Sequence, residues 1–174
     1  MINEKQLKQS WRGKVNNAQG LLFENSIKAA CQTYRNRGIA EIDKTPEPFR
    51  VTKKHPNGEF TGRFTAPAQP DFQGTLSEGR SIVFEAKYTT TDRMKRDVLT
   101  TEQMDVLEYH RKLGALTAVC AGIQDRHYFI PWTRWRDMKL HYGRQYVTQA
   151  DVEKYRVRFT GAVMFLDYIH PQSN

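Results

Sequence analysis

The chain has 174 residues, of which 39% are hydrophobic and 26% are charged. No stretch approaches the roughly 18 consecutive apolar residues that a membrane-spanning helix needs, which excludes an integral helical membrane protein. Length and composition predict a soluble protein with one domain over residues 1–174. The polar segment Met1–Lys14 lacks the apolar run of a secretory signal, so we expect a cytoplasmic protein.

Positive charge is concentrated in the N-terminal third of the chain. The formal net charge is +8, and residues 1–65 hold 12 Lys and Arg against 6 Asp and Glu, whereas residues 66–174 hold 15 against 13. Such an excess indicates an anionic partner such as nucleic acid. A basic face also keeps a protein soluble, so charge alone leaves that alternative open.

The first predicted element is an amphipathic helix over Ala18–Tyr34, where apolar residues recur at steps of three and four. Residues 1–16, which precede it, are predicted to form a basic N-terminal arm. After Gly38, the segment Ile39–Lys44 alternates apolar and polar residues as a strand does.

A projecting hairpin is predicted next, over about residues 51–66. The Pro-Asn-Gly sequence inside Lys53–Gly58 is typical of a tight turn, and Glu59–Thr65 returns as the second arm. This hairpin carries the basic residues Lys53, Lys54 and Arg63.

A second hairpin is predicted from two short apolar segments, Phe72–Leu76 and Arg80–Lys87, which the turn sequence Ser77-Glu78-Gly79 joins. In an antiparallel hairpin the start of the first strand lies beside the end of the second. The pairing therefore places Asp71 near Glu85.

A helix is predicted after the polar loop Thr89–Asp97. Thr100 and Gln103 have the spacing of a capping box at its start, and Gly114 marks its end. The apolar run Ala115–Ala121 that follows is typical of a strand covered on both faces.

The last predicted elements are a strand over Tyr128–Ile130, a helix over Trp132–Leu140 and a helix over Thr148–Tyr155 with Thr148 as its cap. The order of helices and strands predicts an α/β fold with a mixed central β-sheet flanked by helices on its faces.

The strand Ser81–Lys87 carries the residues that indicate chemistry. Side chains alternate between the two faces of a strand, so Glu85 and Lys87 share a face. A carboxylate and an ammonium at the end of an apolar strand are costly to bury unless they pair or coordinate. Two converging carboxylates, from Asp71 and Glu85, suit Mg²⁺, and Lys87 can orient or deprotonate the attacking water and stabilise the phosphate. The set predicts phosphodiester hydrolysis, and the alternative is a surface ion pair beside a turn residue.

The sequence Pro70-Asp71, followed by Glu85-Ala86-Lys87, matches the PD-(D/E)xK pattern of restriction-endonuclease-like nucleases. Residues 21–45 and 68–129 resemble the RecU family of Holliday-junction resolvases. The resemblance is carried by the segments GLLFENSI, GIAEIDKTPEP, PDFQG, FEAKYT and TTEQ. It implies a restriction-endonuclease-like fold and an endonuclease that resolves four-way DNA junctions by paired nicks in homologous recombination and repair.

The same resemblance implies roles for individual residues. Asp71 and Glu85 would bind Mg²⁺, with Mn²⁺ as an alternative ion. Lys87 would stabilise the transition state, and Gln103 would contribute to the metal site. The resemblance also implies a homodimer and a projecting stalk.

Glu24 and Gln103 each have a second interpretation. Glu24 lies at the edge of the apolar stripe of the first helix, where it either reaches over the sheet toward Asp71 as a catalytic residue or remains a solvated helix residue. Gln103 can complete the capping box with Thr100, serve the metal site, or do both.

Six basic residues are candidates for binding DNA phosphates on either side of the cleft. They are Arg12, Lys14, Arg50, Lys53, Lys54 and Arg63.

The sequence departs from the family where Ala68, Gln69 and Pro70 replace small hydroxylated residues before the catalytic aspartate. The stalk-like segment is also shorter. These differences keep two other functions open: a non-catalytic, junction-binding accessory protein of recombination, and a restriction-type or exonucleolytic nuclease of the same superfamily.

Overall fold

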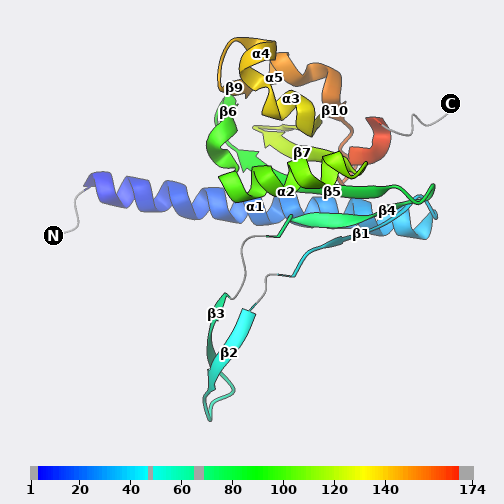
Figure 1. Ribbon diagram of the computed structural model, residues 1–174. Helices are drawn as coiled ribbons and strands as arrows, with labels where there is room; N and C mark the ends of the chain where they lie inside the picture. Colours follow the sequence, from blue (N-terminus) through cyan, green and yellow to red (C-terminus); the bar gives the residue numbers. More distant parts are fainter. Residues whose placement is uncertain (1–3, 47–48, 65–68, 169–174) are drawn as a thin grey trace.

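A six-stranded mixed β-sheet forms the centre of the molecule (Figure 1). The computed structural model describes residues 4–46, 49–64 and 69–168, with side chains for 18–46, 50–63 and 69–167. The strand order is β1-β4-β5-β7-β8-β10, and all neighbouring pairs are antiparallel except β5 and β7, which are parallel. The strands are β1 (Ala40–Lys44), β4 (Phe72–Leu76), β5 (Ser81–Thr89), β7 (Leu116–Ile123), β8 (Arg126–Pro131) and β10 (Arg156–Val157).

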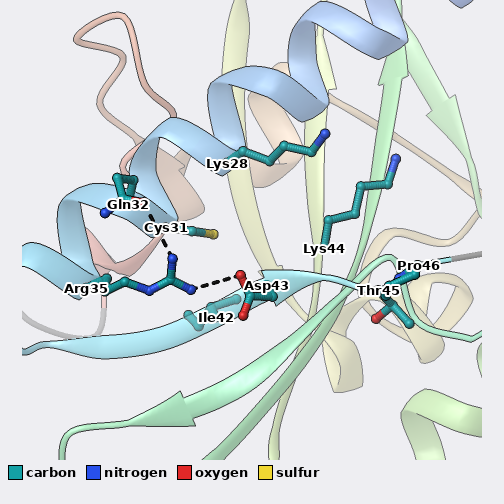
Figure 2. A pocket seen from close by; sticks show the side chains of 9 residues that line it. All are labelled: Lys28, Cys31, Gln32, Arg35, Ile42, Asp43, Lys44, Thr45 and Pro46. Carbon is teal, nitrogen blue, oxygen red and sulfur yellow. Dashed lines mark hydrogen bonds and ion pairs between the residues drawn. The ribbon is translucent and has the colours of Figure 1, made fainter.

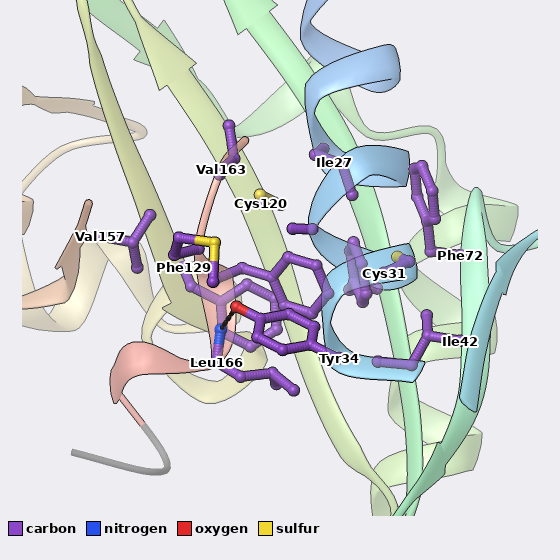
Figure 3. Packing of buried hydrophobic residues seen from close by; sticks show 14 of the residues in the cluster. Ile27, Cys31, Tyr34, Ile42, Phe72, Cys120, Phe129, Val157, Val163 and Leu166 are labelled. Atoms are coloured by element: carbon purple, nitrogen blue, oxygen red, sulfur yellow. Dashed lines mark hydrogen bonds between the residues drawn. The ribbon is translucent and has the colours of Figure 1, made fainter. Parts of the chain in front are cut away.

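Helix α1 (Glu4–Asn36) covers one face of this sheet (Figure 1). Its buried residues Ile27 and Tyr34 pack in one cluster with Phe72 of β4, as Figure 3 shows. The Tyr34 hydroxyl accepts a hydrogen bond of 3.0 Å from the backbone N–H of Leu166, which joins α1 to the short 3₁₀ helix η3 (Phe165–Tyr168). This hydrogen bond therefore ties helix α1 to the C-terminal part of the chain.

The prediction that α1 begins at Ala18 after a separate arm is wrong, because the helix is continuous from Glu4. The signal was present in the sequence. Leu7, Trp11 and Val15 recur at four-residue steps, which continues the apolar period of the helix toward its start. Residues 4–16 of the predicted arm are thus helical.

The opposite face of the sheet is covered by four helices, which share a second buried cluster with β7 and β8. They are α2 (Thr101–Lys112), α3 (Trp132–Arg136), α4 (Met138–Tyr142) and α5 (Gln149–Val152). The helix predicted over Trp132–Leu140 is therefore two short helices, and the one predicted over Thr148–Tyr155 is α5 followed by the 3₁₀ helix η2 (Glu153–Tyr155). Within the described ranges, no helix has the length and apolar character needed to cross a bilayer. The α/β class and the mixed sheet are confirmed.

A small two-stranded sheet lies outside the predicted elements. It pairs β6 (Arg93–Lys95) with β9 (Tyr146–Thr148), and the 3₁₀ helix η1 (Arg96–Val98) follows β6. The loop predicted over Thr89–Asp97 is therefore partly regular. Three residues are too few to show a period, and the partner strand comes about fifty residues later, so local sequence gives little sign of this pairing.

The projecting hairpin is confirmed as β2 (Phe49–Lys54) and β3 (Phe60–Phe64), which extend away from the central sheet in Figure 1. The turn between them closes with a 2.8 Å hydrogen bond from the backbone N–H of His55 to the carbonyl of Glu59. Gly58 adopts φ 84° there, a conformation that suits glycine. The sequence chemistry of this turn therefore matches its geometry.

A close backbone contact holds β1 against β4 at Gly74. A Cβ atom on Gly74 would lie 2.0 Å from the carbonyl oxygen of Glu41 and 2.6 Å from Cα of Ile42. Both atoms belong to the backbone, so they cannot move aside as a flexible side chain can. Only glycine fits this position.

Replacing Gly74 with alanine is therefore expected to lower the free energy of unfolding by about 3 kcal/mol, the upper range for overpacking. Gly20→Ala is the matched control, because no atom lies within 4 Å of a Cβ there and alanine favours a helix interior. Denaturant titration should show a loss for the first variant and no loss for the second. Equal stabilities would contradict the close contact.

Candidate active site

The hairpin of β4 and β5 brings Asp71 beside the middle of β5. Phe72 pairs with Phe84, so Asp71 immediately precedes β4 at the level of Glu85 and Ala86. The backbone N–H of Ala86 donates a 2.9 Å hydrogen bond to Oδ2 of Asp71. This bond fixes the carboxylate of Asp71 against the neighbouring strand.

Three ionisable groups meet at this point. The ammonium Nζ of Lys87 lies 3.2 Å from Oε2 of Glu85 and 3.5 Å from Oδ2 of Asp71. The side chain of Glu85 is 1% exposed, whereas those of Lys87 and Asp71 are 21% and 24% exposed. The structure thus brings together the three residues that the sequence nominates, with Glu85 at the buried end and the other two open to solvent.

Gln103 joins the cluster from α2. Its Nε2 donates a 2.6 Å hydrogen bond to Oε2 of Glu85, and its Oε1 accepts a 3.1 Å bond from the backbone N–H of Thr100. Thr100 in turn accepts from the backbone N–H of Gln103, which completes the capping box. The capping-box interpretation of Gln103 is confirmed, and the same side chain contacts the buried carboxylate of Glu85, while its part in a metal site stays a prediction.

Burial makes the charged form of Glu85 unfavourable. Loss of hydration raises the pKa of Glu85 to about 8, and repulsion from the Asp71 carboxylate adds to the rise. The ammonium of Lys87 lowers it only in part. A second positive charge at this place would stabilise both carboxylates.

The donor set fits a hard divalent cation. Asp71 and Glu85 supply two carboxylates, and Mg²⁺ typically binds one or two protein carboxylates together with water and substrate phosphate oxygens. Within the described residues, no group of three or more His, Cys, Asp or Glu side chains is arranged for a metal ion. The pair suits an ion that shares its coordination with substrate rather than one enclosed by protein.

Glu24 belongs to α1 and pairs with a residue of the edge strand β1. Its carboxylate forms an ion pair with Lys44, the last residue of β1, and among the described residues no hydrogen bond or ion pair joins it to Asp71 or Glu85. Lys44 was not nominated as a site residue. Alternation along β1 places it on the same face as the buried Ile42, toward α1, and this pattern is readable from the sequence.

The structure divides the six candidate DNA-binding residues. Arg50, Lys53, Lys54 and Arg63 are exposed on the β2–β3 hairpin. Arg12 and Lys14 belong to α1, but their side chains lie outside the described part of the chain.

A β-bulge determines on which face of the hairpin each basic side chain lies. Arg50 pairs with Arg63 and Lys53 with Thr61, whereas Lys54 pairs with Phe60, and the register shifts between Val51 and Lys53. Side chains alternate along β3 and opposed residues share a face. One face therefore carries Arg50, Lys53 and Arg63, and the other carries Lys54.

The raised pKa of Glu85 predicts a pH effect on stability. Between about pH 5 and pH 8 in EDTA, the folded state keeps the Glu85 proton and the unfolded state loses it, so the free energy of unfolding should fall as the pH rises. Glu85→Gln should remove this contribution.

Denaturant titrations of both proteins at the two ends of this range measure the difference. Burial lowers the pKa of His127, which makes the free energy of unfolding rise with pH. Because His127 is present in both proteins, its contribution cancels in the difference between them. Identical pH dependence in the two proteins would contradict a protonated Glu85.

Comparisons with known proteins gave one family match and a similar solved structure. The family model described as recombination protein U, RecU, matches residues 18–173. A solved structure of Hjc from Archaeoglobus fulgidus, described as a Holliday junction resolvase from an archaeal hyperthermophile, is similar with a TM-score of 0.47 and 12% sequence identity. That similarity covers 78% of this chain and 88% of the Hjc chain. Among curated proteins, none matches by sequence.

Proposed function

This chain belongs to the RecU family, and we propose from that premise that it is a divalent-metal-dependent endonuclease that cuts four-way DNA junctions. The observation that carries the proposal is that Nζ of Lys87 lies within 3.5 Å of carboxylate oxygens of both Asp71 and Glu85. In the proposed reaction, water attacks the phosphorus of a phosphodiester and the sugar oxygen leaves.

Asp71 and Glu85 are the residues that would hold Mg²⁺, or Mn²⁺ in its place. When bound, such an ion supplies Lewis-acid polarisation of the phosphate and lowers the pKa of a bound water. Two contacts hold these carboxylates in position: the N–H of Ala86 on Asp71 and the amide of Gln103 on Glu85. The protein thus organises its acidic groups before substrate arrives.

Lys87 has the position of a group that stabilises developing negative charge. Its ammonium contacts both carboxylates and its side chain is 21% exposed, so solvent and substrate can reach it. The ammonium can donate a hydrogen bond to a phosphate oxygen while negative charge accumulates on that oxygen, or it can orient the attacking water. Glu24, paired with Lys44, is proposed to support the site from α1.

We further propose that the enzyme works as a homodimer in the cytoplasm. A two-fold axis would place one active site opposite each of two equivalent strands of a junction, so paired nicks follow from symmetry. This arrangement serves homologous recombination and DNA repair.

The test compares cleavage of a synthetic four-way junction with cleavage of a linear duplex of the same sequence. Purified protein should cut the junction in Mg²⁺ and not in EDTA, with symmetric nicks and little cutting of the duplex. Equal cutting of both substrates would leave a general nuclease. Binding without cutting in any divalent metal ion would favour the non-catalytic accessory protein.

The two faces of the hairpin provide a separate prediction. Lys53→Ala should weaken junction binding and reduce the slope of log affinity against log salt concentration by about 1, because one phosphate contact is lost. Lys54→Ala makes the same charge change on the other face and should have a smaller effect. Equal effects of the two variants would show that the faces do not differ in DNA contact.

A further inference from the structure

An aromatic pocket of ≈ 240 Å³ lies between α1 and the first residues of β8. The ring of His127 stacks between two others, with its centroid 5.5 Å from that of Phe23 and 5.0 Å from that of Phe159. Leu22 and Phe159, which also line the pocket, are 68% and 56% exposed. Large apolar side chains that stay open to solvent beside a formed aromatic stack indicate an interaction surface.

The opposite flank of α1 differs in character. The groove there, beside β1, is lined by charged side chains, and two of its cations are already paired (Figure 2). Arg35 is bound by Glu41 and Asp43, and Lys44 is paired with Glu24. This groove is therefore a charged surface, whereas the pocket on the other flank is an apolar one.

The N-terminal part of α1 continues past the central sheet, as Figure 1 shows. At helical spacing, Leu7, Trp11 and Val15 fall on the same side of the helix as Leu22. This α1 arm, residues 4–17, thus extends the apolar side of the helix beyond the pocket. A continuous helix cannot fold back onto its own flank, so a cover for the arm and the pocket together comes from another molecule.

We infer that a second copy of this chain covers this surface, with the two α1 helices packed antiparallel about a two-fold axis close to Val15. The inference rests on the homodimer of the proposed function and names the surface that forms it. At this register Trp11 of one copy lies opposite Gln19 of the other, and Leu7 lies opposite Phe23. Gln19 and Phe23 line the pocket, so a single two-fold operation places each arm over the pocket of the other copy.

The charges of the α1 arm are compatible with this pairing. Lys8 lies opposite Leu22 in the same register, and Arg12 lies opposite Ala18. Each of the other charged residues of the arm also lies opposite an uncharged residue. Because like charges placed opposite each other would oppose association, this pattern favours a second copy as the partner.

Analytical ultracentrifugation over a concentration series tests the surface by measuring the dissociation constant of the dimer. Leu22→Glu should raise this constant by at least about tenfold, because a carboxylate would enter an apolar interface. Leu140→Glu makes the same change at a side chain of α4 that is 82% exposed, and it should leave the constant unchanged. Since Leu22 is exposed in the single chain, its variant should keep the fold, which circular dichroism verifies.

Cysteine cross-linking tests the register. Val15→Cys places two thiols beside the two-fold axis, so mild oxidation should give a covalent dimer. Ala29→Cys is the control on the same side of α1, and it should not cross-link, because a helical rise of about 1.5 Å per residue puts its two thiols roughly 40 Å apart. The native thiols of Cys31 and Cys120 are buried and should not contribute.

The outcomes separate this inference from the proposed function. If the wild type is a dimer but Leu22→Glu dimerises with unchanged affinity, or Val15→Cys does not cross-link, this interface is wrong, while the homodimer and the nuclease stand. Equal cross-linking of Ala29→Cys would also overturn the register. A monomeric wild type would overturn the interface together with the homodimer, and junction cleavage would still decide the nuclease by itself.

Discussion

Replacing Asp71 with asparagine is expected to slow cleavage of a four-way junction by at least about a thousandfold, or about 4 kcal/mol in transition-state free energy. Asparagine has nearly the same shape and retains an oxygen that can accept the 2.9 Å hydrogen bond from Ala86. What the change removes is one of two carboxylate charges that would hold the cation, whose Lewis-acid contribution is worth several kcal/mol. Single-turnover cleavage in saturating Mg²⁺ measures the effect.

Asp105→Asn is the matched control, because it makes the same chemical change at an exposed position of α2. It should cut like the wild type. Asp71→Asn should also bind the junction at least as tightly as the wild type in EDTA, since a negative charge near the DNA is lost. Wild-type cleavage by this variant would contradict the assigned role, and thermal unfolding separates a catalytic defect from loss of the fold.

Local rules of sequence were enough to predict the centre of the site. Alternation along β5 places Glu85 and Lys87 on one face, and the short turn before β5 makes β4 its antiparallel neighbour, which brings Asp71 alongside. The capping box at Thr100 fixes where α2 begins and hence where Gln103 stands. Each of these inferences depends on neighbours within about fifteen residues along the chain.

The remaining features depend on contacts that the chain makes over longer distances. The ion pair of Glu24 with Lys44 requires the packing of α1 on β1, which joins residues twenty positions apart. The bulge between Val51 and Lys53 shifts the register of the hairpin by one residue, which reverses the face on which Lys53 would otherwise lie. The sequence pattern therefore predicts individual helices and strands better than it predicts how they pack and in which register strands pair.

Replacing Lys87 with alanine is expected to slow junction cleavage by about 100- to 1,000-fold, the range for removing one preorganised donor to a developing anion. The variant also leaves Asp71 and the buried Glu85 without their common cation. In EDTA, loss of the ammonium should raise the pKa of Glu85 further, so the fall in stability that the wild type shows up to about pH 8 should continue to higher pH in the variant. Lys95→Ala, which removes an exposed cation from β6, is the control and should cut normally.

Metal-dependent stability separates the role of Lys87 from that of Asp71. Binding of Mg²⁺ to the folded state raises Tm through mass action, and this rise depends on the carboxylates rather than on the ammonium. Lys87→Ala should therefore gain at least as much Tm from Mg²⁺ as the wild type, because no protein cation competes for the site, while Asp71→Asn should gain little. A Lys87→Ala protein that fails to respond to Mg²⁺ would show that Lys87 organises the metal site instead of acting on the phosphate.

Lys87→Arg distinguishes an electrostatic role of Lys87 from a role as general base. Arginine keeps the positive charge but does not lose its proton, so it cannot accept one from water. Retained cleavage by this variant would assign Lys87 an electrostatic role and exclude it as the general base.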